Sequence, residues 1–241
     1  MIYKQELSHH YDKKYSKSNY KDVKPAQVKG YPRNRFEAAV HWGGEGDSLL
    51  EAGYGSGNVL LTLKDNYKKC VGIELSEVRA NELKKLFSGY DDISILVGNI
   101  EDRSLNLKKE SFDTILMNAV IEHLITPIQT LKYLAGLLES GGRIVIITPN
   151  IAKYTRRIKL LFGYFPSTAS LDEGLLMYDE KTKTDLYDEG HLHYFKYRSL
   201  KRILIERVGL SKVICYGFSS SPILTRLFPK LFSDCLVIGI K

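Results

Sequence analysis

From residue 48 to residue 148 the chain alternates short apolar runs with segments of helical periodicity, and this alternation restricts the fold most. The runs are continuously apolar, as expected for strands that are buried on both faces of a sheet. Strands separated by helices favour a parallel sheet. The pattern therefore predicts an α/β fold with a doubly wound, mostly parallel sheet and helices on both faces. The predicted strands cover residues 48–52, 70–74, 93–97, 112–117 and 143–148.

Local sequence signals mark where two of the intervening helices begin or end. Ser76 is a typical N-cap residue, and it predicts a helix over residues 77–87. Pro127 is a typical first residue of a helix, and the apolar positions that follow it keep helical spacing to residue 138. We expect Gly141-Gly142 to end that helix.

The C-terminal part predicts two more strands. A helix is expected to begin near Ser199, and strands are expected over residues 213–218 and 235–240. The linker between the two strands contains Pro222 and Pro229. We expect the strands to form an antiparallel pair at an edge of the sheet.

The loop after the first strand is rich in glycine and reads Glu51-Ala-Gly53-Tyr-Gly55-Ser-Gly57. Glycines there permit positive φ and a close approach of the backbone to a ligand. The dinucleotide fingerprint G-x-G-x-x-G requires a third glycine at position 58 or 60, where this chain has Asn58 and Leu60. The loop therefore does not match the pattern that binds NAD.

Ligand-type residues also follow the next three strands. Glu74 closes the second strand, 21 residues after Gly53, and a carboxylate there accepts both hydroxyls of a ribose. Gly98-Asn99-Ile100 follows the third strand, and Asn118-Ala119 follows the fourth. Because parallel strands end at one edge of a sheet, these residues predict a site for an adenosine-containing ligand.

With these motifs in order, the chain resembles the class I S-adenosylmethionine-dependent methyltransferases over about residues 31–241. It is similar to the small-molecule type, which includes the methyltransferase type 11, 12 and 23 groups and the MetW-like group. The resemblance implies a Rossmann-like sheet of seven strands with an antiparallel last strand. It also implies S-adenosylmethionine as cofactor and S-adenosylhomocysteine as product. The matching segments are 50–57, 72–75, 98–101, 111–116, 121–124 and 141–150.

The resemblance assigns cofactor contacts to the strand ends. The glycine loop lines the methionine half, Glu74 holds the ribose, and Leu75 packs on the adenine. The family usually has Asp at Asn99, and a small residue or cysteine at Tyr54. In related enzymes an arginine before the first strand pairs with the methionine carboxylate, and a solvated basic face is the alternative for this segment. The candidate cofactor-binding residues are Arg33, Glu51, Gly53, Tyr54, Gly55, Gly57, Glu74, Leu75, Asn99, Ile100, Asn118 and Ala119, with Arg35 close to Arg33.

Three histidines are candidate catalytic residues. His123 follows the fourth strand and suits a general base at neutral pH, although a structural role at the start of a helix is favoured. His191 and His193 alternate onto one face of an extended segment, and we expect them to line the acceptor pocket. A metal site made by these two histidines and Asp188 is the alternative. The prediction is a pocket without a metal.

The net charge of +7 is unevenly distributed. Residues 1–40 hold nine basic and four acidic residues, and residues 151–171 hold four basic residues and no acid. Residues 172–190 carry seven acids. We interpret residues 1–40 as an arm or lid with a lead-in helix, and residues 41–241 as the methyltransferase domain. Residues 150–198 would form an acceptor-side insertion in that domain.

These segments are expected to close over the acceptor, so the charge favours a small anionic or amphiphilic molecule over a polynucleotide. The predicted function is methyl transfer to oxygen or carbon of a metabolite, saccharide or lipid-linked intermediate. An RNA-directed methyltransferase and a non-catalytic binding protein are the alternatives. The Asn/Asp-Pro-Pro-aromatic turn of base-methylating enzymes is absent at residues 118–121. Residues 156–163 and 224–232 interleave basic and apolar side chains, which suits weak contact with a membrane surface or ordinary core packing.

Other features restrict the setting. Cys70, Cys215 and Cys235 lack the spacing of a zinc cluster, and we expect reduced thiols in core strands of a cytoplasmic protein. The apolar runs are too short for a transmembrane helix, and the polar N-terminus lacks the apolar region of a secretory signal. Nothing in the sequence indicates an oligomeric state.

Overall fold

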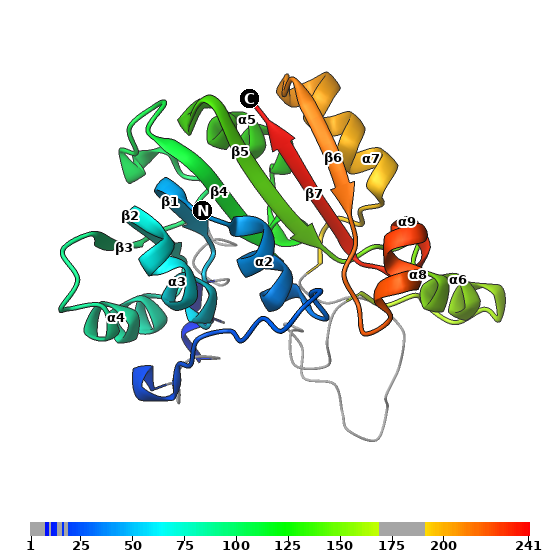
Figure 1. Cartoon of the computed structure of the whole chain (residues 1–241), viewed down its shortest axis with the longest axis horizontal. Helices are drawn as coiled ribbons and strands as arrows, with labels where there is room; N and C mark the ends of the chain where they lie inside the picture. Colours follow the sequence, from blue (N-terminus) through cyan, green and yellow to red (C-terminus); the bar gives the residue numbers. More distant parts are fainter. Residues whose placement is uncertain (1–7, 10, 14–15, 17–18, 169–190) are drawn as a thin grey trace.

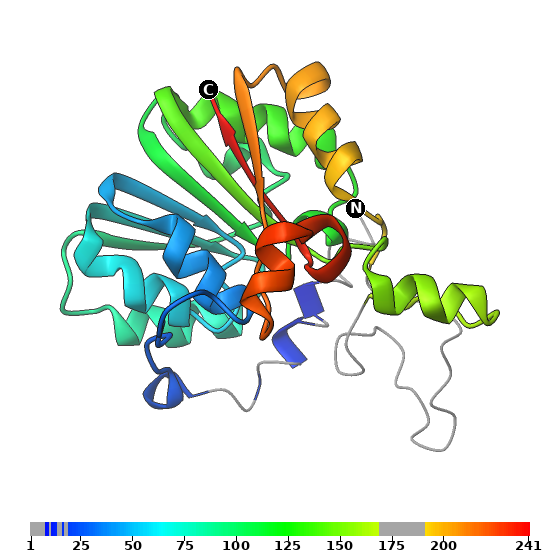
Figure 2. The same ribbon diagram turned by 45° about the vertical axis from the view of Figure 1, so that its right-hand side comes forward.

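Seven strands form one twisted sheet in the order β3-β2-β1-β4-β5-β7-β6 (Figures 1 and 2). The computed structural model describes residues 8–9, 11–13, 16, 19–168 and 191–241. The strand β7 runs antiparallel to both of its neighbours, and the other strand pairs are parallel. The predicted mostly parallel sheet is therefore confirmed. The strands are β1 (Gly46–Ala52), β2 (Tyr67–Glu74), β3 (Ile93–Val97), β4 (Phe112–Asn118), β5 (Leu138–Thr148), β6 (Lys212–Tyr216) and β7 (Cys235–Ile240).

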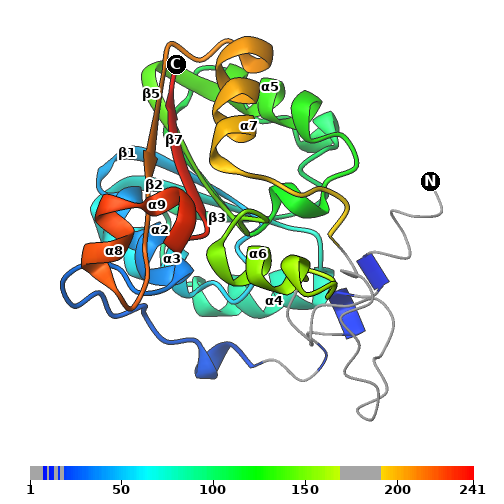
Figure 3. The ribbon, with the colours of Figure 1, turned by 90° about the vertical axis from the view of Figure 1, so that its right-hand side faces the viewer.

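Helices cover both faces of this sheet (Figure 3). One core cluster packs α2, α3 and α4 on the sheet, and the other packs α5 and α7 on the opposite face. The helix α7 continues as a π-helical turn over Ile203–Val208. The fold is thus doubly wound, as the sequence predicts. The helices are α2 (Arg35–Gly43), α3 (Asn58–Leu63), α4 (Glu77–Leu86), α5 (Pro127–Leu137), α6 (Tyr154–Leu161), α7 (Tyr197–Arg202), α8 (Pro222–Leu227) and α9 (Pro229–Phe232).

The strand β1 shows why its sequence is continuously apolar. Leu49 belongs to the core on the α2 side, and Leu50 belongs to the core on the α5 side. Both side chains are completely buried. Since successive side chains of a strand point to opposite faces, a strand covered on both faces needs apolar residues at every position.

The two helix signals are confirmed, and one glycine pair has a different role. The Ser76 hydroxyl accepts a hydrogen bond from the Arg79 amide at 3.1 Å, as an N-cap does, and Pro127 begins α5. The helix α5 ends at Leu137, however, and Gly141-Gly142 lies inside β5. The pairing of β4 with β5 is irregular there, and a Cβ at position 142 would lie 3.0 Å from the Glu139 carbonyl oxygen. Gly142 therefore permits a close backbone contact and Gly141 a positive φ of 78°, and the pair does not end the helix.

The C-terminal strands form the expected antiparallel pair, with β6 at the edge and β7 between β5 and β6. The linker between them differs from the prediction, because it contains the short helices α8 and α9. Pro222 and Pro229 are the first residues of these helices, where the missing amide proton costs no hydrogen bond. The helix expected near Ser199 begins two residues earlier, at Tyr197.

The winding of the chain places a crevice at the carboxyl ends of β1 and β4. The chain runs from β1 outward through β2 to β3, and then returns to β4 on the other side of β1, so the strand order reverses its direction between β1 and β4. Ligands of open α/β sheets bind at such a switch point. Across the described residues, no helix combines the length and apolar character needed to span a bilayer.

The N-terminal segment runs along this edge of the sheet. Asp12 Oδ1 accepts hydrogen bonds from the Ser76 hydroxyl at 2.7 Å and from the Val78 amide at 3.2 Å. Further along, the Ala26 amide donates to Thr62 Oγ1 at 2.7 Å. These contacts attach the segment to α3 and to the first turn of α4.

Candidate active site

A cavity of about 320 Å³ lies at the switch point, where the loops after β1, β2, β3 and β4 meet. Its wall contains ten of the twelve candidate cofactor-binding residues, and Arg33 and Gly57 are not on it. Residues from four separate parts of the sequence are therefore brought to one space. The ten are Glu51, Gly53, Tyr54, Gly55, Glu74, Leu75, Asn99, Ile100, Asn118 and Ala119.

Two positions of the loop after β1 require glycine for different structural reasons. Gly53 has φ 74°, and a Cβ there would lie 2.6 Å from Val120 Cγ2, so a side chain would disturb the cavity wall. Gly57 precedes α3, and its missing Cβ leaves room for the side chain of Leu83. Gly53 thus shapes the cavity, whereas Gly57 lets α4 pack closely.

Glu74 is held by backbone amides at the end of β2. Its Oε2 accepts a hydrogen bond from the Gly55 amide at 3.0 Å, and its Oε1 accepts from Leu75 at 2.9 Å and Ser76 at 3.2 Å. Burial raises the pKa of this carboxyl above its usual value, although the three amides oppose the rise. The hydrogen bonds fix the carboxylate against the glycine loop.

Glu51 is the second buried carboxyl of the cavity, with 1% of its surface exposed. Burial, followed by repulsion from Glu74, raises the pKa of Glu51 to about 8. Its Oε2 has no hydrogen-bond partner among the described residues. A positively charged ligand group would stabilise the ionised form, so this part of the cavity favours a cation.

Tyr54 packs inward as well as lining the cavity. Its side chain is almost completely buried, and a Cβ at position 72 would lie 2.6 Å from Tyr54 Cδ1. The ring therefore lies on the backbone of β2 where Gly72 leaves space. Packing on Gly72 explains why a large residue is accommodated in this loop.

The loop after β3 is ordered by its own side chains. Asn99 Oδ1 accepts a hydrogen bond from the Glu101 amide at 2.9 Å. Glu101 Oε1 in turn accepts from the amide of Thr126 at 2.7 Å and from its hydroxyl at 2.8 Å. Glu101 also lines the cavity. It lies in a segment that the sequence identified, but it was not proposed as a site residue.

The loop after β4 has an unusual backbone. Ala119 adopts φ 57°, in the left-handed region, while its amide donates to the Ile147 carbonyl at 2.8 Å. Asn118 Oδ1 is buried and has no hydrogen-bond partner among the described residues. Strained backbone and an unsatisfied acceptor on a cavity wall are typical of ligand sites.

Two arginines near the start of α2 differ in position. Arg33 is exposed and lies outside the cavity, whereas Arg35 is half-buried on its wall with Phe36. Asn34 caps the helix by accepting from the amides of Phe36 and Glu37. The cap separates Arg33, in the preceding loop, from Arg35, in the first helical turn. The sequence motif contains both arginines, and the predicted cofactor contact was Arg33, the one that lies outside the cavity.

One cavity residue, Tyr11, comes from the N-terminal segment and was not predicted individually. No periodicity or spacing distinguishes it from the other tyrosines of this polar segment. Tyr3 and Tyr15, which the lid interpretation also included, lie outside the described residues. The neighbouring contacts of Asp12 with Ser76 and Val78, and that of Ser8 Oγ with the Leu75 carbonyl at 3.4 Å, bring this segment to the edge.

The three histidines occupy different places. His123 lines the cavity, and its ring centroid lies 4.7 Å from that of His191, which is 5% exposed. His193 is not on the cavity wall, and its ring lies 6.3 Å from that of Phe195. Asp188, the remaining member of the alternative metal site, lies outside the described residues.

Solved structures of methyltransferases have a similar fold. The S-adenosylmethionine-dependent methyltransferase from Archaeoglobus fulgidus is 16% identical, with a TM-score of 0.58 over 86% of this chain and 91% of that chain. A second such enzyme, from Aquifex aeolicus, is 16% identical, with a TM-score of 0.54 over 95% of this chain and 96% of that chain. The carbon methyltransferase CurJ is 18% identical, with a TM-score of 0.54 over 81% of this chain, which spans only 48% of the CurJ chain.

These likenesses concern the fold alone, and the family follows from the sequence itself. Among curated proteins, none matches this sequence. The family model of a methyltransferase domain matches residues 26–214, which is well over half of the chain. That range contains every strand-end loop of the cavity. The chain therefore belongs to the methyltransferase-domain family and, with this fold, to the class I S-adenosylmethionine-dependent methyltransferases.

Proposed function

We propose that the chain transfers a methyl group from S-adenosylmethionine to oxygen or carbon of a small anionic or amphiphilic acceptor. The observation that carries this proposal is the cavity that Glu51 and Glu74 line, because two buried carboxylates suit a ligand with hydroxyls and positive charge. When bound, S-adenosylmethionine supplies an electrophilic methyl group on a positively charged sulfur. The residues of the chain bind the cofactor and the acceptor, orient them, and remove a proton from the acceptor.

Glu74 is the residue that we assign to the ribose. A carboxylate offers about four acceptor positions, and three backbone amides already use Glu74. Binding both ribose hydroxyls therefore displaces one of these amides. The Gly55 amide is the candidate, because it is the only one of the three that belongs to the glycine loop.

The methionine end is assigned to Asn118 and Arg35. The buried Asn118 Oδ1 lacks a partner among the described residues, and an ammonium group is a suitable donor for it. The Arg35 guanidinium suits a carboxylate, to which it donates two parallel hydrogen bonds. For the adenine edge we retain Asn99, whose Oδ1 has a second lone pair beyond the one that accepts from Glu101.

His123 is the candidate proton acceptor when the nucleophile is a hydroxyl. It lies on the cavity wall, as the last residue of the short helical turn (Ile121–His123) that follows β4. A neutral imidazole accepts a proton near neutral pH. A carbon nucleophile that is already acidic requires less help, so the effect of a His123→Ala substitution distinguishes the two acceptor classes.

The surface beyond β5 supports an amphiphilic acceptor. Leu161 and Phe162, at the end of α6, are 79% and 71% exposed, and Ile223 of α8 is 75% exposed. The rings of Tyr154 and Phe232 lie 5.1 Å apart and connect α6 to α9. Large exposed apolar side chains beside basic residues are typical of surfaces that bind lipids or lipid-linked molecules.

Calorimetry with S-adenosylmethionine and S-adenosylhomocysteine tests the proposal. We expect the folded protein to bind both compounds, and Glu74→Gln to weaken binding at least about tenfold by removing the charge-assisted hydrogen bonds. Glu77→Gln, an exposed acid in the first turn of α4, is the matched control and should bind like the wild type. A folded wild-type protein that binds neither compound would contradict the proposal.

A further inference from the structure

Glu122, His123 and His191 form a compact cluster next to the cofactor cavity. One potential ligand atom from each residue lies within 4.8 Å of the other two. Glu122 and His191 are only 1% and 5% exposed, and the rings of the two histidines meet edge to face. Polar groups buried this deeply need a structural or chemical reason.

The backbone holds the cluster together. The amides of Leu192 and His193 both donate to the Glu122 carbonyl, at 2.8 Å and 3.2 Å. A short β-bridge between Asn150 and Phe195 attaches the same segment to the end of β5. The segment that carries His191 is therefore fixed on the turn that carries Glu122 and His123.

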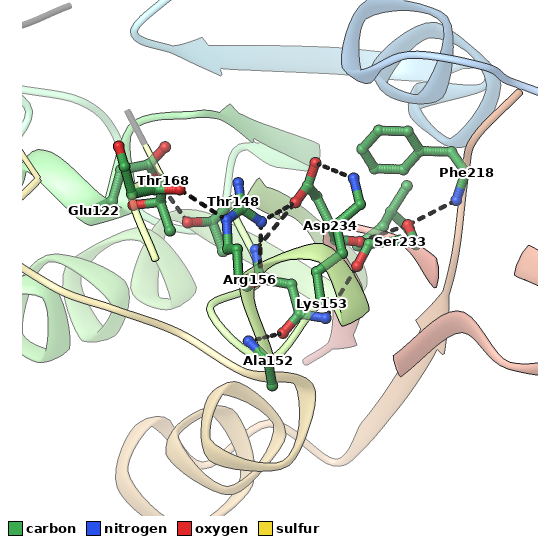
Figure 4. Close-up of polar contacts among 12 residues, drawn as sticks. Glu122, Thr148, Ala152, Lys153, Arg156, Thr168, Phe218, Ser233 and Asp234 are labelled. Atoms are coloured by element: carbon green, nitrogen blue, oxygen red, sulfur yellow. Dashed lines mark hydrogen bonds and ion pairs between the residues drawn. The ribbon is translucent and has the colours of Figure 1, made fainter. Parts of the chain in front are cut away.

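Hydrogen bonds with two nearby threonines orient two of the three side chains. Thr148 Oγ1 donates to Glu122 Oε2 at 2.9 Å, and Glu122 and Thr148 are seen together in Figure 4. Thr168 Oγ1 lies 2.7 Å from His191 Nδ1. When Nδ1 carries the proton, Nε2 has the lone pair that binds a metal. Such second contacts commonly orient metal-ligating histidines and carboxylates.

We propose that Glu122, His123 and His191 bind a divalent transition-metal ion at the boundary between the cofactor cavity and the acceptor site. Two imidazoles and one carboxylate suit ions such as Zn²⁺, Fe²⁺ or Mn²⁺. Ligand atoms around such an ion are about 3 to 4 Å apart. Side-chain movements of about 1 Å would bring the three ligand atoms to this separation. Three protein ligands leave coordination positions open.

The open coordination positions of the ion indicate which class of methyl acceptor the site would take. Because His123 lines the cofactor cavity, an oxygen bound to the ion would lie beside the space that we assign to the cofactor. The site therefore favours an acceptor with a hydroxyl or enol oxygen, whose pKa a divalent ion lowers. With the ion bound, His123 is a ligand, and the ion takes over from His123 the task of assisting deprotonation. This acceptor class rests on the proposed methyl transfer, whereas metal binding by the cluster does not.

Metal binding can be measured without any methyl acceptor. Tag-free protein is stripped with a chelator and titrated with Zn²⁺ by calorimetry and with Co²⁺ by visible absorption. We expect one ion per chain, and at least about tenfold weaker binding by His191→Ala and by Glu122→Gln. Thr168→Val should weaken binding by about ten- to a hundredfold through the orientation of His191. His193→Ala is the matched control, because this histidine is outside the cluster, and it should bind the ions like the wild type.

The outcomes separate this proposal from the proposed function. Circular dichroism and thermal melting establish that each variant is folded, and S-adenosylmethionine binding is measured on the same preparations. If the folded wild type binds neither ion, the metal site is refuted whether or not the cofactor binds. Equal weakening by His193→Ala and His191→Ala also refutes it, because it indicates unspecific binding. One ion bound by the cluster without cofactor binding supports the metal site and contradicts the proposed methyl transfer.

Discussion

At the scale of single residues, the cavity combines two carboxyl groups that are almost wholly buried. Burial raises the pKa of both, but three backbone amides surround Glu74, whereas Glu51 has an oxygen without a partner among the described residues. Burying a charge costs free energy unless a partner compensates it. In the ligand-free protein this cost favours the protonated form of Glu51, and a cationic ligand would stabilise the ionised form.

Glu51→Gln is expected to change how the stability of the ligand-free protein depends on pH. The pKa of Glu51 in the folded protein, about 8, is above its ordinary value of 4.5, so the folded state binds this proton more tightly than the unfolded chain. Its contribution is complete below the unfolded pKa and is lost as the pH rises through the folded pKa. Urea unfolding at about pH 5 and about pH 8 should therefore show a larger loss of stability for the wild type than for the variant. Equal losses would contradict the raised pKa.

Arg35 and Arg33 provide a second prediction, in which one arginine is the test for cofactor binding and the other is its matched control. Arg35→Ala should weaken S-adenosylmethionine binding about ten- to a hundredfold, since a charge-assisted pair with the methionine carboxylate is lost. Arg33→Ala should leave binding unchanged, because Arg33 is exposed and lies outside the cavity. Calorimetry measures both. An equal effect of the two substitutions would show that only the general positive charge matters.

At the scale of secondary-structure elements, one carboxylate pairs with two cations at α6. None of its residues is buried. Asp234, just before β7, pairs with Arg156 at 2.8 Å and with Lys153 at 3.4 Å (Figure 4). Burial alone would raise the pKa of Asp234, but these two cations and the hydrogen bonds to it hold the pKa below its usual value. Charge pairing thus adds to the contact between Tyr154 and Phe232 in holding a helix that has no buried residue.

Asp234→Asn should destabilise the protein by about 1–2 kcal/mol at neutral pH, because a partly buried charged hydrogen-bond acceptor is lost. The lowered pKa means that the wild type has this stabilisation above pH 3.8, the ordinary pKa of Asp, and loses it as the pH falls further. The difference from the variant should therefore shrink in acid. Asp47→Asn is the control, since its ion pair with Lys68 is exposed, and urea unfolding should show no measurable change.

At the scale of the whole molecule, the carboxyl edge of the sheet carries two different surfaces. The cofactor cavity lies at the ends of β1 to β4, and the exposed apolar residues of α6 and α8 lie beyond β5 and β7. Residues 151–164 and 219–233, which form the second surface, contain basic residues and no acid. The arrangement suits an acceptor whose polar part enters the cavity region while its apolar part remains at a surface.

The apolar surface predicts binding to anionic lipid vesicles. Replacing both Leu161 and Phe162 by Ser should weaken vesicle binding at least about tenfold, because each apolar side chain contributes about 1.5–3 kcal/mol when it is buried. Ile205→Ser is the control, since Ile205 is 41% exposed but follows α7 away from this surface. Co-sedimentation with vesicles of anionic phospholipid measures the effect. Wild-type protein that remains in the supernatant would contradict the prediction.

The sequence predicts the sheet and the loops of the cavity because their signals are local. Continuous apolar runs identify strands buried on both faces, and Ser76 and Pro127 mark helix starts. Parallel strands all end at one edge, so the strand-end residues can be assigned to one site before any contact is known. The glycine pair after α5 was misinterpreted for the opposite reason. Its role depends on the irregular pairing of β5 with β4, which no local pattern specifies.

The amino-acid sequence by itself determined the α/β class, the cavity loops and the family of this protein, since periodicity, caps and motif spacing operate over short stretches of chain. Only the tertiary structure decided that Arg35 rather than Arg33 reaches the cavity, and that Tyr11 lies on its wall. It also decided that His191 meets His123 while His193 does not join them. These contacts join segments far apart in the chain, and their geometry follows from packing and backbone hydrogen bonds that form only when the whole sheet is assembled.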